Sequence, residues 1–187
     1  MSSRNRVVWR EGLFVKPQHF QQEARHLAHQ LHQRLGGVGS HLYGFSELEI
    51  NHEYLSFGKI ALVRARGVMP DGSAFDIPID SPPPVPLAAH DASVVNQRVY
   101  LALPLRSDGM LEVASEGTYA RRRYVAKPFE VKDVHSDDGD HTTLEVAQFN
   151  MQLMLEREDR SAFTSIPLAR ILDRRPDGGL LLGGHHY

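Results

Sequence analysis

Residues 99–105 of this chain read Val-Tyr-Leu-Ala-Leu-Pro-Leu, so that apolar side chains of one parity stand at Val99, Leu101, Leu103 and Leu105. A spacing of two places such side chains on the same face of a β-strand. The same spacing recurs at Phe149, Met151, Leu153 and Leu155. Because a proline cannot donate a hydrogen bond to a neighbouring strand, we expect Pro104 at a sheet edge or a bulge.

Further strands are expected near residues 43–50, 54–66, 119–131 and 165–173. Turn signals separate the strands, and each places a glycine where a tight turn needs a positive φ: Pro70-Asp71-Gly72, Asp108-Gly109, Asp138-Gly139 and Pro176-Asp177-Gly178. Many short strands joined by such turns favour a mainly β fold, an antiparallel β-sandwich built of hairpins. We expect this sandwich to occupy residues 37–187.

Residues 76–93 interrupt the strand pattern with a proline-rich run that contains Pro82-Pro83-Pro84. Such a run favours an extended, polyproline-like backbone. Two interpretations stay open. The run is either a crossover between sheets or a docking strand for another protein, since a stiff polyproline segment loses little entropy on binding.

Residues 18–35 carry a helical period instead. At 100° per residue one stripe collects the apolar side chains of Phe20, Ala24, Leu27, Leu31 and Leu35. The opposite face collects Gln22, His26, His29 and Gln33. Gly36 and Gly37 then end the helix, as C-terminal glycines do. We therefore expect one amphipathic helix over residues 18–36, packed on the sandwich through its leucine stripe, with its Gln/His face toward water or a partner.

Residues 1–17 are expected to form an extended arm in front of this helix. The arm is rich in apolar side chains without a helical period, and Pro17 suits the first turn of the helix that follows. Full burial of a large apolar side chain such as Trp9, Leu13 or Phe14 contributes roughly 1.5–3 kcal/mol or more. These side chains are therefore expected to pack either on their own sandwich or against a partner or sister subunit.

Composition excludes several classes of protein. The chain has 187 residues, a net charge of −2 and no cysteine, which removes disulfides and thiolate chemistry. No basic stripe dominates, so we expect no nucleic-acid partner, and the run Arg121-Arg122-Arg123 is interpreted as a solvated strand. The sequence lacks a secretory signal and a run approaching the roughly 18 apolar residues of a membrane span. We expect a cytoplasmic protein without direct membrane insertion.

The 11 histidines and 23 acidic residues form no recognisable catalytic or metal-binding motif. His26, His29 and His32 spread over about 200° of a helix, so one metal ion would contact two of them at most. The run from Asp137 to His141 does not follow the calcium-loop pattern and is interpreted as an acidic turn. Nucleophile elbows, phosphate-binding loops and dinucleotide fingerprints are also missing. The sequence therefore predicts no enzyme, no metal and no cofactor.

One motif in the arm is specific. The pattern Trp-x-Glu-Gly-x-x-x-x-Pro-Gln-His-Phe-Gln resembles the opening of the TssK family, the baseplate adaptors of bacterial type VI secretion machines. The matching positions are Trp9, Glu11, Gly12, Pro17, Gln18, His19, Phe20 and Gln21. The order of one helix followed by many strands is also similar to the N-terminal part of that family.

The resemblance implies a trimeric, cytoplasmic adaptor. Its N-terminal β-sandwich, similar to the shoulder of phage receptor-binding proteins, would dock onto a wedge of TssF and TssG. A helical neck and a head that contacts the inner-membrane complex follow in the family, and both are expected to be absent from this chain, with membrane-complex binding and trimerisation affected. We expect the partner-binding residues to be Val8, Trp9, Glu11, Leu13, Phe14, Pro17, Gln18, His19 and Phe20. The competing hypothesis is a carbohydrate- or peptide-binding β-sandwich without a secretion role.

Overall fold

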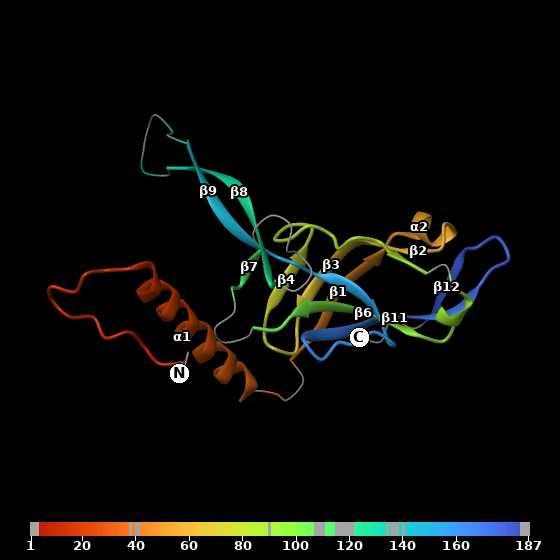
Figure 1. Cartoon of the computed structure of the whole chain (residues 1–187), viewed down its shortest axis with the longest axis horizontal. Coiled ribbons are helices and arrows are strands. Elements are labelled where there is room, and N and C mark those ends of the chain that lie inside the picture. Colours follow the sequence, from red (N-terminus) through yellow and green to blue (C-terminus); the bar gives the residue numbers. More distant parts are fainter. Residues whose placement is uncertain are drawn as a thin grey trace. The chain divides into compact units, whose positions relative to one another are not determined.

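The structure is a computed structural model that describes residues 4–37, 39, 42–89, 91–106, 111–114, 122–133, 135, 139 and 141–183. The chain forms two compact units, Met1–Leu42 and Tyr43–Tyr187. The first unit contains the arm and one helix, and the second contains the strands (Figure 1).

Helix α1 spans Pro17–Gly36 in the first unit. Proline suits the first position because the first N–H groups of a helix have no partner within it. Leu27 and Leu31 of the leucine stripe are 60% and 61% exposed. Within this unit the arm lies along the polar face of α1 and leaves the stripe uncovered. Packing of α1 on the sandwich stays a prediction.

Two antiparallel sheets form most of the second unit. The first sheet has the order β1-β3-β4 and contains β1 (Gly44–Ile50), β3 (Leu62–Val68) and β4 (Ala74–Ile77). The second has the order β10-β6-β11-β12 and contains β10 (Gln152–Leu155), β6 (Arg98–Pro104), β11 (Phe163–Arg174) and β12 (Leu180–Gly183). The proline-rich run leads from β4 in the first sheet to β6 in the second, as the crossover interpretation requires.

The two sheets share one hydrophobic core. The first sheet contributes Ile50, Ala65, Phe75 and Ile77, and the second contributes Val99, Leu101, Leu103, Ile166 and Ile171. Val99, Leu101 and Leu103 of β6 thus point into the core, which confirms the interpretation of their spacing. Leu105 was expected on the same face, but it follows the end of β6 and is 42% exposed. The predicted antiparallel β-sandwich is confirmed.

Shorter elements complete the second unit. They are α2 (His52–Ser56), β2 (Lys59–Ile60), β5 (Leu87–Ala88), the 3-10 turn Ala92–Val94 and β7 (Val113–Ala114). Strand β2 pairs with β5. Strand β7 lies parallel to β8 (Tyr124–Lys132), which forms a long antiparallel ribbon with β9 (His141–Phe149) (Figure 1). Most side chains of this ribbon are exposed.

The strand expected over residues 54–66 is partly wrong, because α2 occupies its first residues. Asn51 caps this helix, since its Oδ1 accepts hydrogen bonds from the backbone N–H groups of Glu53 (3.0 Å) and Tyr54 (3.3 Å). A side-chain oxygen that satisfies the first N–H groups stabilises a helix even of one turn. Only β2 and β3 follow as strands.

The second alternating run, from Phe149 to Leu155, is also not one strand. It divides into the end of β9 and the whole of β10.

Pro104 is the last residue of β6, which lies between two other strands, so its expected place at an edge or bulge is wrong. Pro104 lacks an N–H group, but at the end of a strand this removes no hydrogen bond from the pairing that precedes it. The irregularity lies in β11 instead, where the register shifts between Pro167 and Ala169.

The glycine turns are confirmed where the structure describes them. Gly72 and Gly178 adopt φ values of 83° and 90° in the hairpins β3–β4 and β11–β12, and Gly139 adopts 68°. The expected turn at residues 108–109 and the acidic residues 137, 138 and 140 lie outside the described residues.

Arg123 corrects the interpretation of the basic run as a solvated strand. It is 3% exposed, and its Nη1 donates to the backbone carbonyl oxygen of Pro104 at 2.6 Å. Its Nη2 lies 2.9 Å from Oδ2 of Asp71 and also contacts the hydroxyl of Ser73. The guanidinium is buried because carboxylate, hydroxyl and carbonyl acceptors converge on it. Residue 121 lies outside the described residues.

Candidate protein-interaction site

The arm in front of α1 folds back along the helix. The backbone N–H of Val7 donates to Oε2 of Glu23 at 3.3 Å, and Nε2 of Gln22 donates to the carbonyl oxygen of Asn5 at 2.6 Å. One turn further along the helix, Nδ1 of His26 lies 2.7 Å from the carbonyl oxygen of Arg4. The arm therefore runs antiparallel to α1, held through its own backbone.

A tight turn returns the chain from the arm to the helix. Gly12 has a φ of 76°, which a residue with a Cβ atom adopts only with strain. The backbone N–H of Leu13 donates to the carbonyl oxygen of Arg10 at 3.2 Å, which closes the turn. The backbone N–H of Lys16 then donates to Nδ1 of His19 at 3.0 Å, so the imidazole satisfies a donor just before the helix. Gly12 and His19 thus have local structural roles.

Trp9 lies against the first turn of α1. Its ring centroid is 6.0 Å from that of His19 and 6.2 Å from that of Phe20, both in tilted arrangements. Contacts of this kind between aromatic rings contribute roughly 0.5–1.5 kcal/mol beyond the area that they bury. They hold Trp9 in place, although it remains 45% exposed.

Large apolar side chains of the arm and turn remain in contact with water. Phe14 is 80% exposed, and Val8, Val15 and Phe20 are also exposed. A group of exposed apolar side chains on a soluble protein typically marks a surface that binds another molecule. The arm is thus a defined loop that presents aromatic side chains outward.

The structure brings together only part of the predicted site. Trp9, His19 and Phe20 are in contact, and Leu13 and His19 are half-buried. The remaining predicted residues are exposed, and they are Val8, Glu11, Phe14, Pro17 and Gln18. For Glu11, Pro17 and Gln18 no side-chain contact in the described part of the chain favours a role in binding.

Sequence reasoning missed the residues that hold the arm. Gln22 and His26 were expected to face water or a partner, and Glu23 was not considered. Their side chains instead bind backbone atoms of residues 4–7, and Glu23 also lies 3.8 Å from Nε of Arg6. The spacing of Gln22 and His26 by four residues was the available signal, because it places both on one line along the helix.

The described residues contain no group of three or more histidine, cysteine, aspartate or glutamate side chains arranged to hold a metal ion. In the same part of the chain, no helix is both long and apolar enough to cross a membrane. The arm and α1 therefore offer hydrogen-bonding groups and apolar side chains, which are the elements of a protein interface.

The comparison with known proteins identifies the class of protein. The family described as "Bacterial Type VI secretion, VC_A0110, EvfL, ImpJ, VasE" matches residues 19–187, and the chain belongs to this family. The chain is 38% identical over 183 residues to the type VI secretion system baseplate component TssK1 of Pseudomonas aeruginosa. That match covers 97% of this chain and 41% of the relative, so the chain spans about two fifths of the relative's length. The resemblance to TssK is confirmed.

Solved structures agree with this assignment. A crystal structure of TssK has a TM-score of 0.87 and 33% identity, and the match covers 96% of this chain and 41% of that one. A chain of a TssK-TssF-TssG baseplate subcomplex has a TM-score of 0.86 at 21% identity, with 98% of this chain and 61% of that chain covered. At that identity the second match supports the fold alone.

Proposed function

We propose that this chain is a structural adaptor of a type VI secretion baseplate, and that its arm attaches it to a wedge of TssF and TssG. The observation that carries the proposal is the exposed aromatic surface of Trp9, Phe14 and Phe20 on a loop held by α1. Membership of the family and the TssK-TssF-TssG subcomplex among similar structures support the choice of partner. The role is one of binding rather than catalysis, and the protein acts in the cytoplasm.

The fixed conformation of the arm favours tight binding. A flexible segment loses conformational entropy when it binds, and pre-ordering removes part of that cost. The hydrogen bonds of residues 4–7 to Gln22, Glu23 and His26 provide this order before a partner arrives. Aromatic side chains on a rigid segment are the residues that most often dominate binding energy.

In the longer proteins of this family we expect the same unit to link the wedge to the membrane complex through segments outside the part that this chain matches. We also propose that such proteins bind copies of themselves, as trimers. Neither role depends on a single residue of the arm, so the wedge contact is the part that can be tested directly.

The test is a titration of Trp9→Ala and Phe14→Ala against a purified TssF–TssG complex, with a thermal melt of each variant. We expect both variants to melt like the parent and to bind about thirtyfold more weakly, since a hot-spot side chain contributes roughly 2 kcal/mol. Phe129→Ala is the matched control, because Phe129 is an exposed phenylalanine of the β8–β9 ribbon. It should bind like the parent.

Three results would contradict the proposal in different ways. If the parent chain does not bind TssF–TssG, the adaptor function is wrong. If Trp9→Ala and Phe14→Ala bind like the parent, the chain is an adaptor but the arm is not its contact. If they melt far lower and bind normally in the cold, the arm is only a structural clasp.

A further inference from the structure

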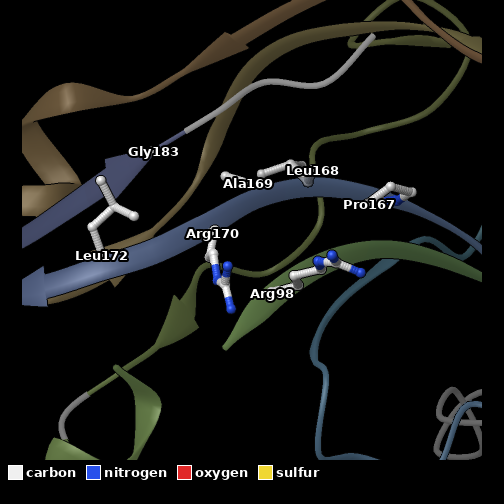
Figure 2. A pocket seen from close by; sticks show the side chains of 7 residues that line it. All are labelled: Arg98, Pro167, Leu168, Ala169, Arg170, Leu172 and Gly183. Carbon is white, nitrogen blue, oxygen red and sulfur yellow. The ribbon is translucent and has the colours of Figure 1, made fainter. Parts of the chain in front are cut away.

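Two arginines face each other directly on the outer side of the second sheet. Arg98 of β6 and Arg170 of β11 are register partners in the antiparallel pair. Both side chains are exposed, and Figure 2 shows them on neighbouring strands at the edge of one pocket. Like charges placed directly opposite each other destabilise a sheet.

Among the residues that the structure describes, no carboxylate pairs with either guanidinium. Nε of Arg170 donates to the carbonyl oxygen of Asn96 at 3.1 Å, which is an uncharged acceptor. The Oε2 atom of Glu156 accepts from the backbone N–H of Arg98 at 3.1 Å rather than from its guanidinium. In the described part of the chain, neither guanidinium has a carboxylate at ion-pair distance.

A third guanidinium adds to the positive charge of this face. Arg160 lies 3.8 Å from the ring centroid of Tyr100, which is two residues from Arg98 on the same side of β6. Its Nη1 donates to the backbone carbonyl oxygens of Leu155 (3.1 Å) and Glu156 (2.9 Å). The charge of Arg160 is therefore fixed in position, and within the described residues it has no carboxylate at ion-pair distance.

An apolar wall lies beside the two arginines. Together they border a pocket of about 490 Å³, here called the arginine pocket, lined by Arg98, Pro167, Leu168, Ala169, Arg170, Leu172 and Gly183 (Figure 2). The register shift between Pro167 and Ala169 bends β11 at this point. The side chain of Leu172 lies over Gly183, where a Cβ atom would collide with it.

We propose that the arginine pocket binds an extended segment of a partner protein in which an aspartate or glutamate adjoins a large apolar side chain. The carboxylate would lie between Arg98 and Arg170 and relieve their repulsion, because a guanidinium binds a carboxylate through two parallel hydrogen bonds. The neighbouring side chain would lie against Leu172 and Pro167. An inorganic anion would leave this apolar wall in contact with water.

The energetics of the arginine pair favour a binding role. Two arginines that repel each other, without a carboxylate of the described residues beside them, lower the stability of the fold. Residues that lower stability in this way are found most often at functional sites. This inference does not depend on the arm or on TssF and TssG, because the charge complementarity of the pocket alone defines the ligand.

The first part of the test separates binding from folding. Arg98→Gln and Arg170→Gln are expected to melt at or above the temperature of the parent, because each removes the repulsion. Arg34→Gln, in the last turn of α1, is the control and should melt like the parent. If either pocket variant melts clearly below the parent, the two arginines have a structural role and the proposal is wrong.

The second part uses a defined probe, the peptide Ac-Gly-Leu-Asp-Leu-Gly-NH2, titrated into the whole chain while the arginine Nε–Hε signals are followed by NMR. We expect the signals of Arg98 and Arg170 to shift, and each glutamine variant to bind at least about tenfold more weakly. The analogue with asparagine in place of aspartate should bind as weakly as the variants do. Equal affinity for the two peptides, no binding by the parent, or normal binding by both variants would overturn the proposal. A failure of TssF–TssG binding would leave this result unchanged.

Discussion

Arg123 is expected to be the polar side chain on which the second unit depends most. Three protein groups accept hydrogen bonds from its guanidinium: the carbonyl oxygen of Pro104, Oδ2 of Asp71 and the hydroxyl of Ser73. Arg123→Met keeps an unbranched apolar stem but leaves Asp71 without its cation. The Asp71 side chain is 25% exposed and stays in contact with water, so the cost comes mainly from the hydrogen bonds of a charged donor and from the buried carbonyl oxygen of Pro104 that is left without one, about 1.5–3 kcal/mol.

The melting temperature converts this cost into a measurable shift. For a domain of this size, 1 kcal/mol corresponds to about 2–4 °C, so Arg123→Met should melt about 3–12 °C below the parent. Calorimetry and urea denaturation both measure the effect. Arg122→Met is the matched control, because Arg122 is half-buried rather than buried and, among the described residues, its guanidinium donates to the carbonyl oxygen of Leu111 alone. If Arg123→Met melts within about 2 °C of the parent, the burial argument is incorrect.

Further substitutions test the backbone, the arm and the core. Gly67→Ala should cost about 1–3 kcal/mol in urea denaturation, because a backbone carbonyl oxygen of β1 occupies the place of the new Cβ. Glu23→Ala should release the arm, so that the amide of Val7 exchanges its hydrogen faster while the melting temperature of the second unit stays the same. Leu144→Gln should change the unfolding free energy by no more than about 0.5 kcal/mol, since Leu144 of β9 is 50% exposed, whereas Leu101→Ala should cost about 2–5 kcal/mol. Equal effects of the last two would contradict the assignment of the core.

The sequence predicts those strands of the sandwich that have one side buried in the core, because burial leaves an alternating pattern of apolar residues. The alternation of Val99, Leu101 and Leu103 places one side of β6 in the core, and the glycines at 72 and 178 form the turns expected of them. The nine residues of β9 were missed because that strand is largely exposed. Its pairing with β8 depends on backbone hydrogen bonds, which leave no period in the apolar residues.

Helix α2 was missed for a related reason. Five residues are too few to show a helical period, and the helix exists because Asn51 satisfies its first N–H groups. The sequence around it alternates enough apolar residues to suggest a strand. The capping asparagine was the only local signal for the correct assignment.

The sequence predicted which residues of the arm belong to the candidate site, but it did not predict how the arm is folded. The apolar arm was recognisable because side chains such as Trp9 and Phe14 are costly to leave in water. The spacing of Gln22 and His26 places both on one line along α1, but it does not identify their partners, since these side chains and Glu23 bind backbone atoms, which every residue carries. The pairing of Arg98 with Arg170 was equally hidden, because it depends on the register shift in β11.

The two proposed surfaces differ in physical character, so salt separates them. Contact through Trp9 and Phe14 is mainly hydrophobic and should change little between about 0.1 M and 1 M salt. Contact through Arg98 and Arg170 is exposed and electrostatic, and the Debye length falls from about 10 Å to about 3 Å over that range. A partner that uses the arm should therefore keep its affinity at high salt, whereas one that uses the arginine pocket should lose it. If one natural partner covers both surfaces, its affinity should fall with salt in the parent and become insensitive to salt in the Arg98→Gln, Arg170→Gln double variant.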